Sequence, residues 1–427
     1  MTSTSISRVF KRGVPSFGVA FLMAASGVAQ AAANVMLAHM LSPRDFGVIS
    51  AIQVVAFFGG NVSPLGRDQA LPRLIGPDRG AAEIPWSYIG GDTLRHAVLP
   101  ISILIGAVSI FFVWSESVTL IVLSSVVVAL LTFGVGASRV SANILRVAKS
   151  AVSGQVALNL PRYLLFISVA GIYLTGIGTS RLEVPLFAFA AIGVLSFFFY
   201  RLSLRVIPLV SDPGDHQDAI RSLRAESKYF LWTALTLVGL SYVDRLSIAA
   251  ILGPADLGTY AAVWWIVFTP FSLLQNSIGF VLLPLLRGCT SRKQIRQNLL
   301  NFGVAGGVLL VFGGVLIVSL FEPVFHYLYQ GKFVADNVLV IWLTGCGSLV
   351  VIYSLPSSLV GAWGGNAELA RLARFGWFAL VAGIGLSVAG AYEYGLRGVA
   401  VAMFVAFFIR ASGASLIGVG SAIPFAK

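Results

Sequence analysis

The stretch DRLSIAAILGPADLGTYAA, residues 244–262, contains the pattern around which the rest of the chain is organised. Its second half repeats a stretch near the N-terminus: LAHMLSPRDFGVISA, residues 37–51, aligns with IAAILGPADLGTYAA, residues 248–262. Identical residues stand at Ala38/Ala249, Leu41/Leu252, Pro43/Pro254, Asp45/Asp256, Gly47/Gly258 and Ala51/Ala262. The repeat predicts that the chain is an internal duplication.

The composition is that of a protein that lies in a membrane. Hydrophobic residues make up 57% and charged residues 11% of the chain, and the mean hydropathy is +0.89. Soluble domains carry about 25% charged residues, and several apolar runs here exceed the ~18 residues that indicate a membrane span. Because the runs are continuous and do not alternate like barrel strands, we expect an all-α polytopic membrane protein.

Twelve spans are expected, in two bundles of six. They cover about 16–41, 46–66, 97–114, 117–138, 151–177, 184–206, 229–252, 257–285, 299–320, 336–362, 369–392 and 396–422. Of the 29 Lys and Arg residues, 23 lie in alternate connections, which predicts cytoplasmic N- and C-termini. The first apolar run is longer than a signal-peptide core, so the first helix is expected to be uncleaved. The longest inner connection, 208–228, separates an N-terminal bundle, 1–207, from a C-terminal bundle, 229–427. Because six is even, the two bundles would share one orientation.

Several kinds of function receive no support from the sequence. The net charge of +12 lies in short segments between apolar runs, where it acts as an orientation signal, so no nucleic-acid partner is expected. The 2 cysteines and 4 histidines have no metal-ligand spacing. Phosphate-loop, GxSxG and HExxH motifs do not occur. We therefore expect no enzyme, no metal and no cofactor.

Charged residues inside spans are the first candidates for a functional site. Arg245 would lie about 10 Å below the outer surface, and Arg410 would lie near the middle of the last span. A charge at such depth costs ~2.5–3.5 kcal/mol on insertion scales, so it should face a wet cavity or a partner. Adjacent helical residues point in different directions, so Asp244 is not expected to neutralise Arg245 alone. Two alternatives stay open: a substrate cavity, or a structural ion pair such as Asp244 with Arg410.

Polar amides form a second group of candidates. Asn34 occupies the repeat position of Arg245, and Gln275 and Asn276 lie in the second helix of the second half. These residues could bind substrate, although amides in membrane helices commonly form helix-helix hydrogen bonds.

Other repeated or charged positions have a structural explanation. In the repeated turns, Pro43 and Pro254 would end one helix, and the following aspartates, Asp45 and Asp256, would cap the next. At the inner end of the second span, the pair at positions 67–68 would serve orientation or headgroup contact.

Four segments resemble the Wzx-type polysaccharide-biosynthesis flippases of the multidrug/oligosaccharidyl-lipid/polysaccharide exporter superfamily. The segments are LAHMLSPRDFGVISA at 37–51, VDRLSIAAILGPADLGTYAA at 243–262, LLPLL at 282–286 and YQGKF at 329–333. The resemblance covers nearly the whole chain through its length and span number.

The resemblance implies a transporter of the bacterial inner membrane whose two six-helix bundles surround a central cavity. Its substrate would be an undecaprenyl-pyrophosphate-linked oligosaccharide for O-antigen lipopolysaccharide, capsule or exopolysaccharide, moved by alternating access between membrane leaflets. An H⁺ or Na⁺ gradient would drive the movement, and Arg245 and Arg410 would meet the pyrophosphate or an acidic sugar. A multidrug-type cation-coupled antiporter of the same superfamily is the alternative. It is disfavoured because no Asp or Glu is expected in the middle of the first six spans.

Overall fold

The computed structural model describes residues 3–71, 84–113, 116–177, 181–205, 207, 216–287, 289 and 291–420. Nearly all of these residues are helical, and no strand occurs among them. The chain forms two compact units, one of residues 1–33 and 52–235, the other of residues 34–51 and 236–427. The division falls inside three helices, the first, the second and the one that spans residues 216–240, so the end of the first helix and the start of the second belong to the later unit.

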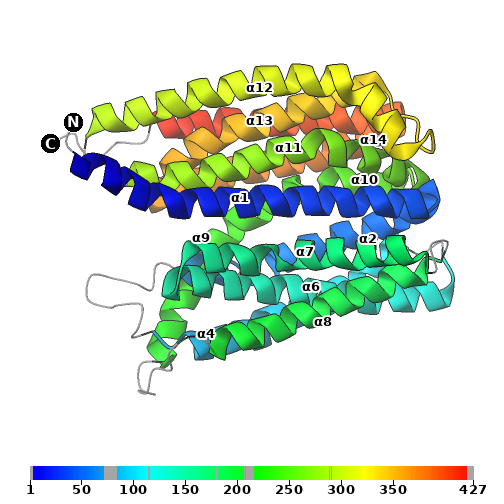
Figure 1. Ribbon diagram of the computed structural model, residues 1–427, viewed down its shortest axis with the longest axis horizontal. Coiled ribbons are helices and arrows are strands. Elements are labelled where there is room, and N and C mark those ends of the chain that lie inside the picture. The colour runs from blue at the N-terminus through cyan, green and yellow to red at the C-terminus, as the bar shows by residue number, and fades with distance from the viewer. Residues whose placement is uncertain are drawn as a thin grey trace. The chain divides into compact units, whose positions relative to one another are not determined.

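The first unit consists of helices that run side by side (Figure 1). They are most of α1 (Ser3–Met40), most of α2 (Pro43–Val62), α3 (Arg67–Ala70), α4 (Trp86–Thr93), α5 (Leu99–Val108), α6 (Val118–Ala148), α7 (Ala151–Thr175), α8 (Glu183–Arg205) and most of α9 (His216–Leu240). A π-helical turn, Leu94–Val98, joins α4 to α5, so the two form one continuous span. A buried core that includes Trp86, Ile89 and Tyr200 packs α4 against α6 and α8.

The second unit is built on the end of α1, the start of α2 and five later helices. These are α10 (Val243–Ile251), α11 (Pro254–Arg287), α12 (Arg292–Tyr329), α13 (Asn337–Trp363) and α14 (Asn366–Gly420). Two buried clusters hold them together, one around Phe271 and Leu282 and one around Tyr353 and Val360.

The long helix α14 is in fact two helices in a hairpin. Gly395 has a φ of 59°, which breaks the helical backbone. A straight helix of the 52 residues 367–418 would be about 78 Å long, more than twice the hydrocarbon thickness. Instead, a Cβ at Gly413 would touch Phe375, and the backbones of Gly390 and Gly398 are in direct contact. Each contact joins a residue before Gly395 to a residue at a similar distance along the chain after it, so the chain reverses direction at Gly395.

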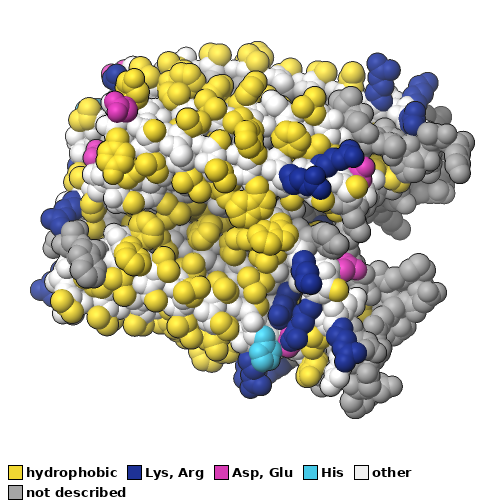
Figure 2. All heavy atoms as spheres, turned by 180° about the vertical axis from the view of Figure 1, so that it is seen from behind, with side chains coloured by type: hydrophobic (Ala, Val, Ile, Leu, Met, Phe, Trp, Pro, Cys, Tyr) yellow, Lys and Arg dark blue, Asp and Glu magenta, His cyan; other side chains and the backbone are white. Residues whose placement is uncertain are grey.

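The described residues thus contain twelve spans. Ten helices are long and apolar enough to cross a membrane, the pair formed by α9 and α10 adds an eleventh span with a bend of 52°, and the second arm of α14 adds the twelfth. Side chains such as Phe111, Leu174 and Phe312 are largely exposed, as expected for surfaces that face lipid. Figure 2 shows hydrophobic side chains over most of one face, with most of its visible Lys and Arg side chains toward one end.

Several span boundaries differ from the sequence prediction. The fourth span, for example, ends at Ala148 and not near residue 138, and two other differences bear on the candidate sites. The third span begins at Trp86 and not near residue 97, so Asp92 lies within a helix. Its charge does not end the helix because two arginines neutralise it, as described below. The seventh span is broken between Leu240 and Val243, whereas a continuous helix was predicted there.

The repeated turns are the starts of α2 and α11. Pro43 and Pro254 are the first residues of these helices, where a missing N–H is tolerated, so they begin helices more than they end them. At the first turn the cap is Ser42: its Oγ accepts a hydrogen bond from the Asp45 N–H at 3.1 Å and donates to the Asp45 carboxylate at 2.6 Å. The prediction that Asp45 is the capping residue is therefore wrong.

The repeated glycines have a role that the sequence did not reveal. A Cβ at Gly47 would overlap the carbonyl oxygen of Pro254, and a Cβ at Gly258 would overlap that of Pro43. Each copy of the repeat thus supplies a glycine that receives the backbone of the other copy. This reciprocal contact, within the second unit, joins α2 to α11.

Candidate functional site

Asp244 and Arg245, at the start of α10, form a buried charged pair in the second unit. Both residues are about 95% buried, with 4% and 5% of their surface exposed. Arg245 Nε donates a hydrogen bond to Asp244 Oδ1 at 3.4 Å, and the Tyr260 hydroxyl donates to Asp244 Oδ2 at 2.8 Å. Adjacent helical side chains were expected to point in different directions, yet Asp244 and Arg245 form an ion pair here.

The break between α9 and α10 explains this pairing. The last carbonyl groups of a helix have no partner within it, and an Arg245 N–H donates to the Ser241 carbonyl oxygen just beyond the end of α9. This bond draws the guanidinium back along the chain, which brings Nε to Asp244. The guanidinium also lies 4.0 Å from the ring centre of Trp264 and 4.7 Å from that of Tyr242, where the ring quadrupoles attract it.

Arg410 lies on the second arm of α14 and is 3% exposed. One terminal nitrogen donates to the Thr236 carbonyl oxygen at 2.9 Å, and the other donates to the Tyr353 hydroxyl at 3.3 Å. Its guanidinium lies 4.7 Å from the ring centre of Tyr353. Its Nε is buried without a hydrogen-bond partner. Among the residues that the structure describes, no carboxylate forms an ion pair with Arg410, and Asp244 pairs with Arg245 instead.

A row of aromatic rings connects the surroundings of the two arginines. Trp264 stacks on Phe268 with a centroid distance of 4.9 Å, and Phe268 lies 6.2 Å from Phe407. Phe407 precedes Arg410 by one helical turn. Both arginines therefore belong to one aromatic and cationic region of the second unit.

The three amide candidates lie in different surroundings. Asn34 is fully buried in the part of α1 that belongs to the second unit. On α11, Gln275 is half-buried and Asn276 is exposed. Neither Gln275 nor Asn276 forms a hydrogen bond with Arg245 or Arg410 in the described structure, so the predicted residues are not gathered into one cluster.

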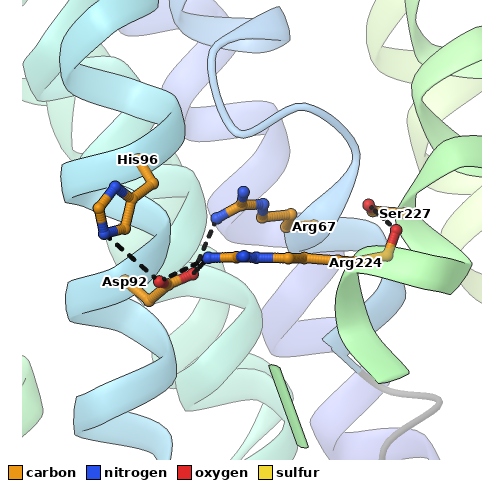
Figure 3. Close-up of polar contacts among 5 residues, drawn as sticks. All are labelled: Arg67, Asp92, His96, Arg224 and Ser227. Carbon is orange, nitrogen blue, oxygen red and sulfur yellow. Dashed lines mark hydrogen bonds and ion pairs between the residues drawn. The ribbon is translucent and has the colours of Figure 1, made fainter. Parts of the chain in front are cut away.

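The first unit contains a charged cluster around Asp92 that the sequence analysis missed (Figure 3). Asp92 accepts hydrogen bonds from Arg67 at 3.0 Å and from Arg224 at 3.0 Å, and His96 Nε2 lies 3.7 Å from its carboxylate. Figure 3 shows the two guanidiniums approaching the carboxylate from α3 and α9. Burial lowers the pKa of Arg67, and the Asp92 carboxylate opposes this change; the guanidinium stays charged at neutral pH.

A second ion pair supports this cluster. Arg139 lies 3.0 Å from the Asp68 carboxylate, which is 2% exposed, and donates to the Asn61 side-chain oxygen at 2.5 Å. The sequence analysis assigned residues 67–68 to orientation or headgroup contact, whereas both side chains form ion pairs inside the first unit. The GGDTLRH stretch at 90–96, in which Asp92 lies five residues before a long apolar run, was the signal that could have revealed the cluster.

The described residues contain no group of His, Cys, Asp and Glu side chains that could hold a metal ion. The chemistry of both clusters is therefore that of ion pairs, cation–π contacts and hydrogen bonds. Among the described residues of these two regions, Arg410 is the only buried cation without a carboxylate partner.

Comparisons with known proteins define the class of fold. No family model and no curated protein sequence matches the chain. Among solved structures, the fold is similar to that of an inward-facing MATE-family multidrug resistance transporter of the MOP superfamily, with a TM-score of 0.65 and 16% identity over 94% of this chain and 100% of that one. The fold is thus that of MOP-superfamily membrane transporters.

Two further structures show the breadth of this class. The lipid II flippase MurJ, in an inward closed conformation, matches with a TM-score of 0.61 and 15% identity, over 93% of this chain and 86% of that one. A MOP-superfamily transporter from Pyrococcus furiosus matches with a TM-score of 0.59 and 15% identity, over 95% and 93% of the two chains. Multidrug transporters and a lipid flippase therefore share the fold of this chain.

Proposed function

We propose that the protein is a secondary transporter that flips an undecaprenyl-pyrophosphate-linked oligosaccharide across the bacterial inner membrane for O-antigen, capsule or exopolysaccharide synthesis. The N-terminal unit and the C-terminal unit would alternate access to the substrate, and an H⁺ or Na⁺ gradient would supply the energy. That the fold is similar to that of a lipid II flippase supports a lipid-linked substrate.

The proposal rests on the burial and the missing carboxylate partner of Arg410. Its guanidinium is buried, lacks a carboxylate partner among the described residues and keeps one N–H donor unused. An uncompensated buried charge costs several kcal/mol, so such a residue in a membrane helix is a functional candidate by default. A pyrophosphate reaching Arg410 would supply both the negative charge and an acceptor for Nε.

The other candidates would have lesser roles in this scheme. Arg245 is partly neutralised by Asp244, so it would attract the anion less strongly than Arg410. Asn34, Gln275 and Asn276 offer amide donors and acceptors that suit sugar hydroxyls.

The multidrug-type antiporter remains the second candidate because a MATE-family transporter shares the fold. The sequence-based argument against an antiporter was that no carboxylate is expected in the middle of the first six spans. The structure weakens this argument, because the Asp92 carboxylate lies within the third span. Arg67 and Arg224 hold Asp92 in ion pairs, however, so its carboxylate already has partners within the first unit.

The test measures binding of undecaprenyl pyrophosphate to purified protein in nanodiscs, with uncharged undecaprenol as the reference. Arg410→Gln should weaken pyrophosphate binding about tenfold or more, because it removes a charged donor worth ~1.5–3 kcal/mol. Arg410→Lys keeps the charge and should retain more of the affinity. Exposed Arg44 provides the matched control, and Arg44→Gln should leave binding unchanged.

Folding of each variant is checked by its size-exclusion profile and melting temperature. Unchanged pyrophosphate affinity in folded Arg410→Gln would contradict the assignment of this residue. Proton- or sodium-driven uptake of ethidium into proteoliposomes, without binding of undecaprenyl pyrophosphate, would instead favour the antiporter.

A further inference from the structure

A large cavity lies within the second unit, away from Arg245 and Arg410. Its volume is about 1000 Å³, which is at the upper end for ligand pockets. The start of α13 and both arms of the α14 hairpin form its walls, and these two helices lie side by side (Figure 1). Most of its lining is apolar, including Val338, Trp342, Leu386 and Val405.

The cavity exists because small residues line the hairpin. Ala389, Gly390, Gly398 and Ala402 all contribute to its wall. The backbones of Gly390 and Gly398 touch, which holds the two arms together near the turn. Side chains that would fill the space beside them are absent, so the hollow follows from the sequence itself.

Charged side chains lie only at the mouth of the cavity. Asp336, Glu393 and Arg397 are its charged lining residues, and Arg397 Nε donates to the Asp336 carboxylate. All three lie at helix ends: Asp336 is the N-cap of α13, and the other two flank the turn at Gly395. The side chains of Arg397 and Asp336 are 62% and 34% exposed, so their polar atoms remain accessible.

The interior of the cavity lies at the depth of the hydrocarbon. From Arg397 at the mouth to Val405 the second arm of α14 rises about 12 Å. The cavity therefore presents charges at the level of lipid headgroups and an apolar interior one to two helical turns deeper. Val334 and Val338 beside it are 86% and 40% exposed, so the opening is bordered by apolar side chains.

We propose that this cavity is a binding site for a phospholipid with a primary-amine headgroup, of the phosphatidylethanolamine type. Arg397 would donate to the lipid phosphate, and the ammonium would donate to the carboxylates of Glu393 and Asp336. The acyl chains would occupy the apolar interior. This site is separate from the proposed transport site and does not depend on the transported substrate.

The charges at the mouth select this headgroup. Two carboxylates and one guanidinium leave an excess of negative charge at the mouth of the cavity, which disfavours an anionic lipid such as phosphatidylglycerol. A choline headgroup carries the same positive charge as ethanolamine but has no N–H to donate. Only a primary ammonium forms charge-assisted hydrogen bonds with the carboxylates.

The experiment compares three dioleoyl lipids, phosphatidylethanolamine, phosphatidylcholine and phosphatidylglycerol, added to the full-length protein in detergent. We expect native mass spectrometry to show one retained phosphatidylethanolamine per chain, bound at least tenfold more tightly than the other two. Glu393→Gln should remove most of this preference, about tenfold, because it removes one carboxylate partner. Ala389→Phe should fill the cavity and abolish retention of all three lipids.

Glu322→Gln is the matched control, because Glu322 is an exposed carboxylate of the same unit that does not line the cavity. This variant should bind phosphatidylethanolamine like the unmodified protein. Equal retention of the three lipids, or an unchanged preference in Glu393→Gln, would overturn the proposal. Displacement of phosphatidylethanolamine by an equal concentration of undecaprenyl phosphate would also overturn it and would assign the cavity to a polyprenyl chain.

Discussion

Replacing Gly47 with alanine is expected to destabilise the second unit, because α2 and α11 are in backbone contact at this residue. A Cβ at Gly47 would overlap the Pro254 carbonyl oxygen and lie 3.1 Å from the Gly258 nitrogen. In the reciprocal position, a Cβ at Gly258 would lie 3.2 Å from the Gly47 nitrogen. Since all these obstructions are backbone atoms, no change of rotamer can relieve them.

The size of the effect follows from this geometry. Non-bonded heavy atoms are most stable about 3.5–4.0 Å apart, so the starts of the two helices would have to separate by roughly 1–2 Å. Overpacking of this kind costs about 1–3 kcal/mol, and the better helix propensity of alanine offsets up to ~1 kcal/mol. The same separation makes room for both methyl groups. The double variant Gly47→Ala/Gly258→Ala should therefore cost less than the sum of the two single variants, with a coupling energy of about 1 kcal/mol.

The assay is thermal unfolding of the purified protein in detergent, followed by tryptophan fluorescence. Gly307 on α12 provides the control, because a Cβ there would meet nothing within 4 Å. Gly307→Ala should be neutral or slightly stabilising. If Gly47→Ala unfolds at the same temperature as the unmodified protein, or if the two single effects simply add, the contact does not have the role described.

Two further predictions concern the buried charged groups. Asp92→Asn should lower stability by about 3 kcal/mol, because it leaves buried Arg67 without its carboxylate; Arg224→Gln, which affects a half-exposed partner, should cost no more than about 1 kcal/mol. Both are measured by thermal unfolding, and equal effects would show that Asp92 is not held mainly by Arg67. Tyr260→Phe should cost about 1–3 kcal/mol, because it removes a donor to buried Asp244. Unchanged stability of this variant would contradict the hydrogen bond.

Most of the fold could be predicted from the sequence because hydrophobicity alone decides which segments enter a bilayer. The errors occurred where tertiary contacts overrode this local signal. Asp92 lies outside the predicted third span, but in the structure it lies within a helix because arginines from distant segments, Arg67 and Arg224, neutralise it. Likewise, the repeated glycines at 47 and 258 could be recognised as a pattern, but their mutual contact could not.

The buried arginines could be selected from the sequence, but their contacts could not. A charge inside an apolar run is visible in the sequence, so Arg245 and Arg410 could be selected. Their partners come from other helices or from a break in the helix, such as Tyr353 for Arg410 and the Ser241 carbonyl for Arg245. Such partners leave no periodic signal, and no local rule could have shown that Arg410 lacks a carboxylate.

The inclusion of residues 34–51 in the second unit has a consequence for synthesis of the chain. The start of α2 is made early, whereas the backbone that covers Gly47 belongs to α11, which begins only at Pro254. At about 5–20 residues per second, the ribosome needs on the order of 10–40 s to produce that partner. During this interval the surface of α2 at Gly47, which α11 later covers, faces lipid or another protein. Folding of the second unit therefore cannot be completed until the C-terminal half of the chain has been synthesised.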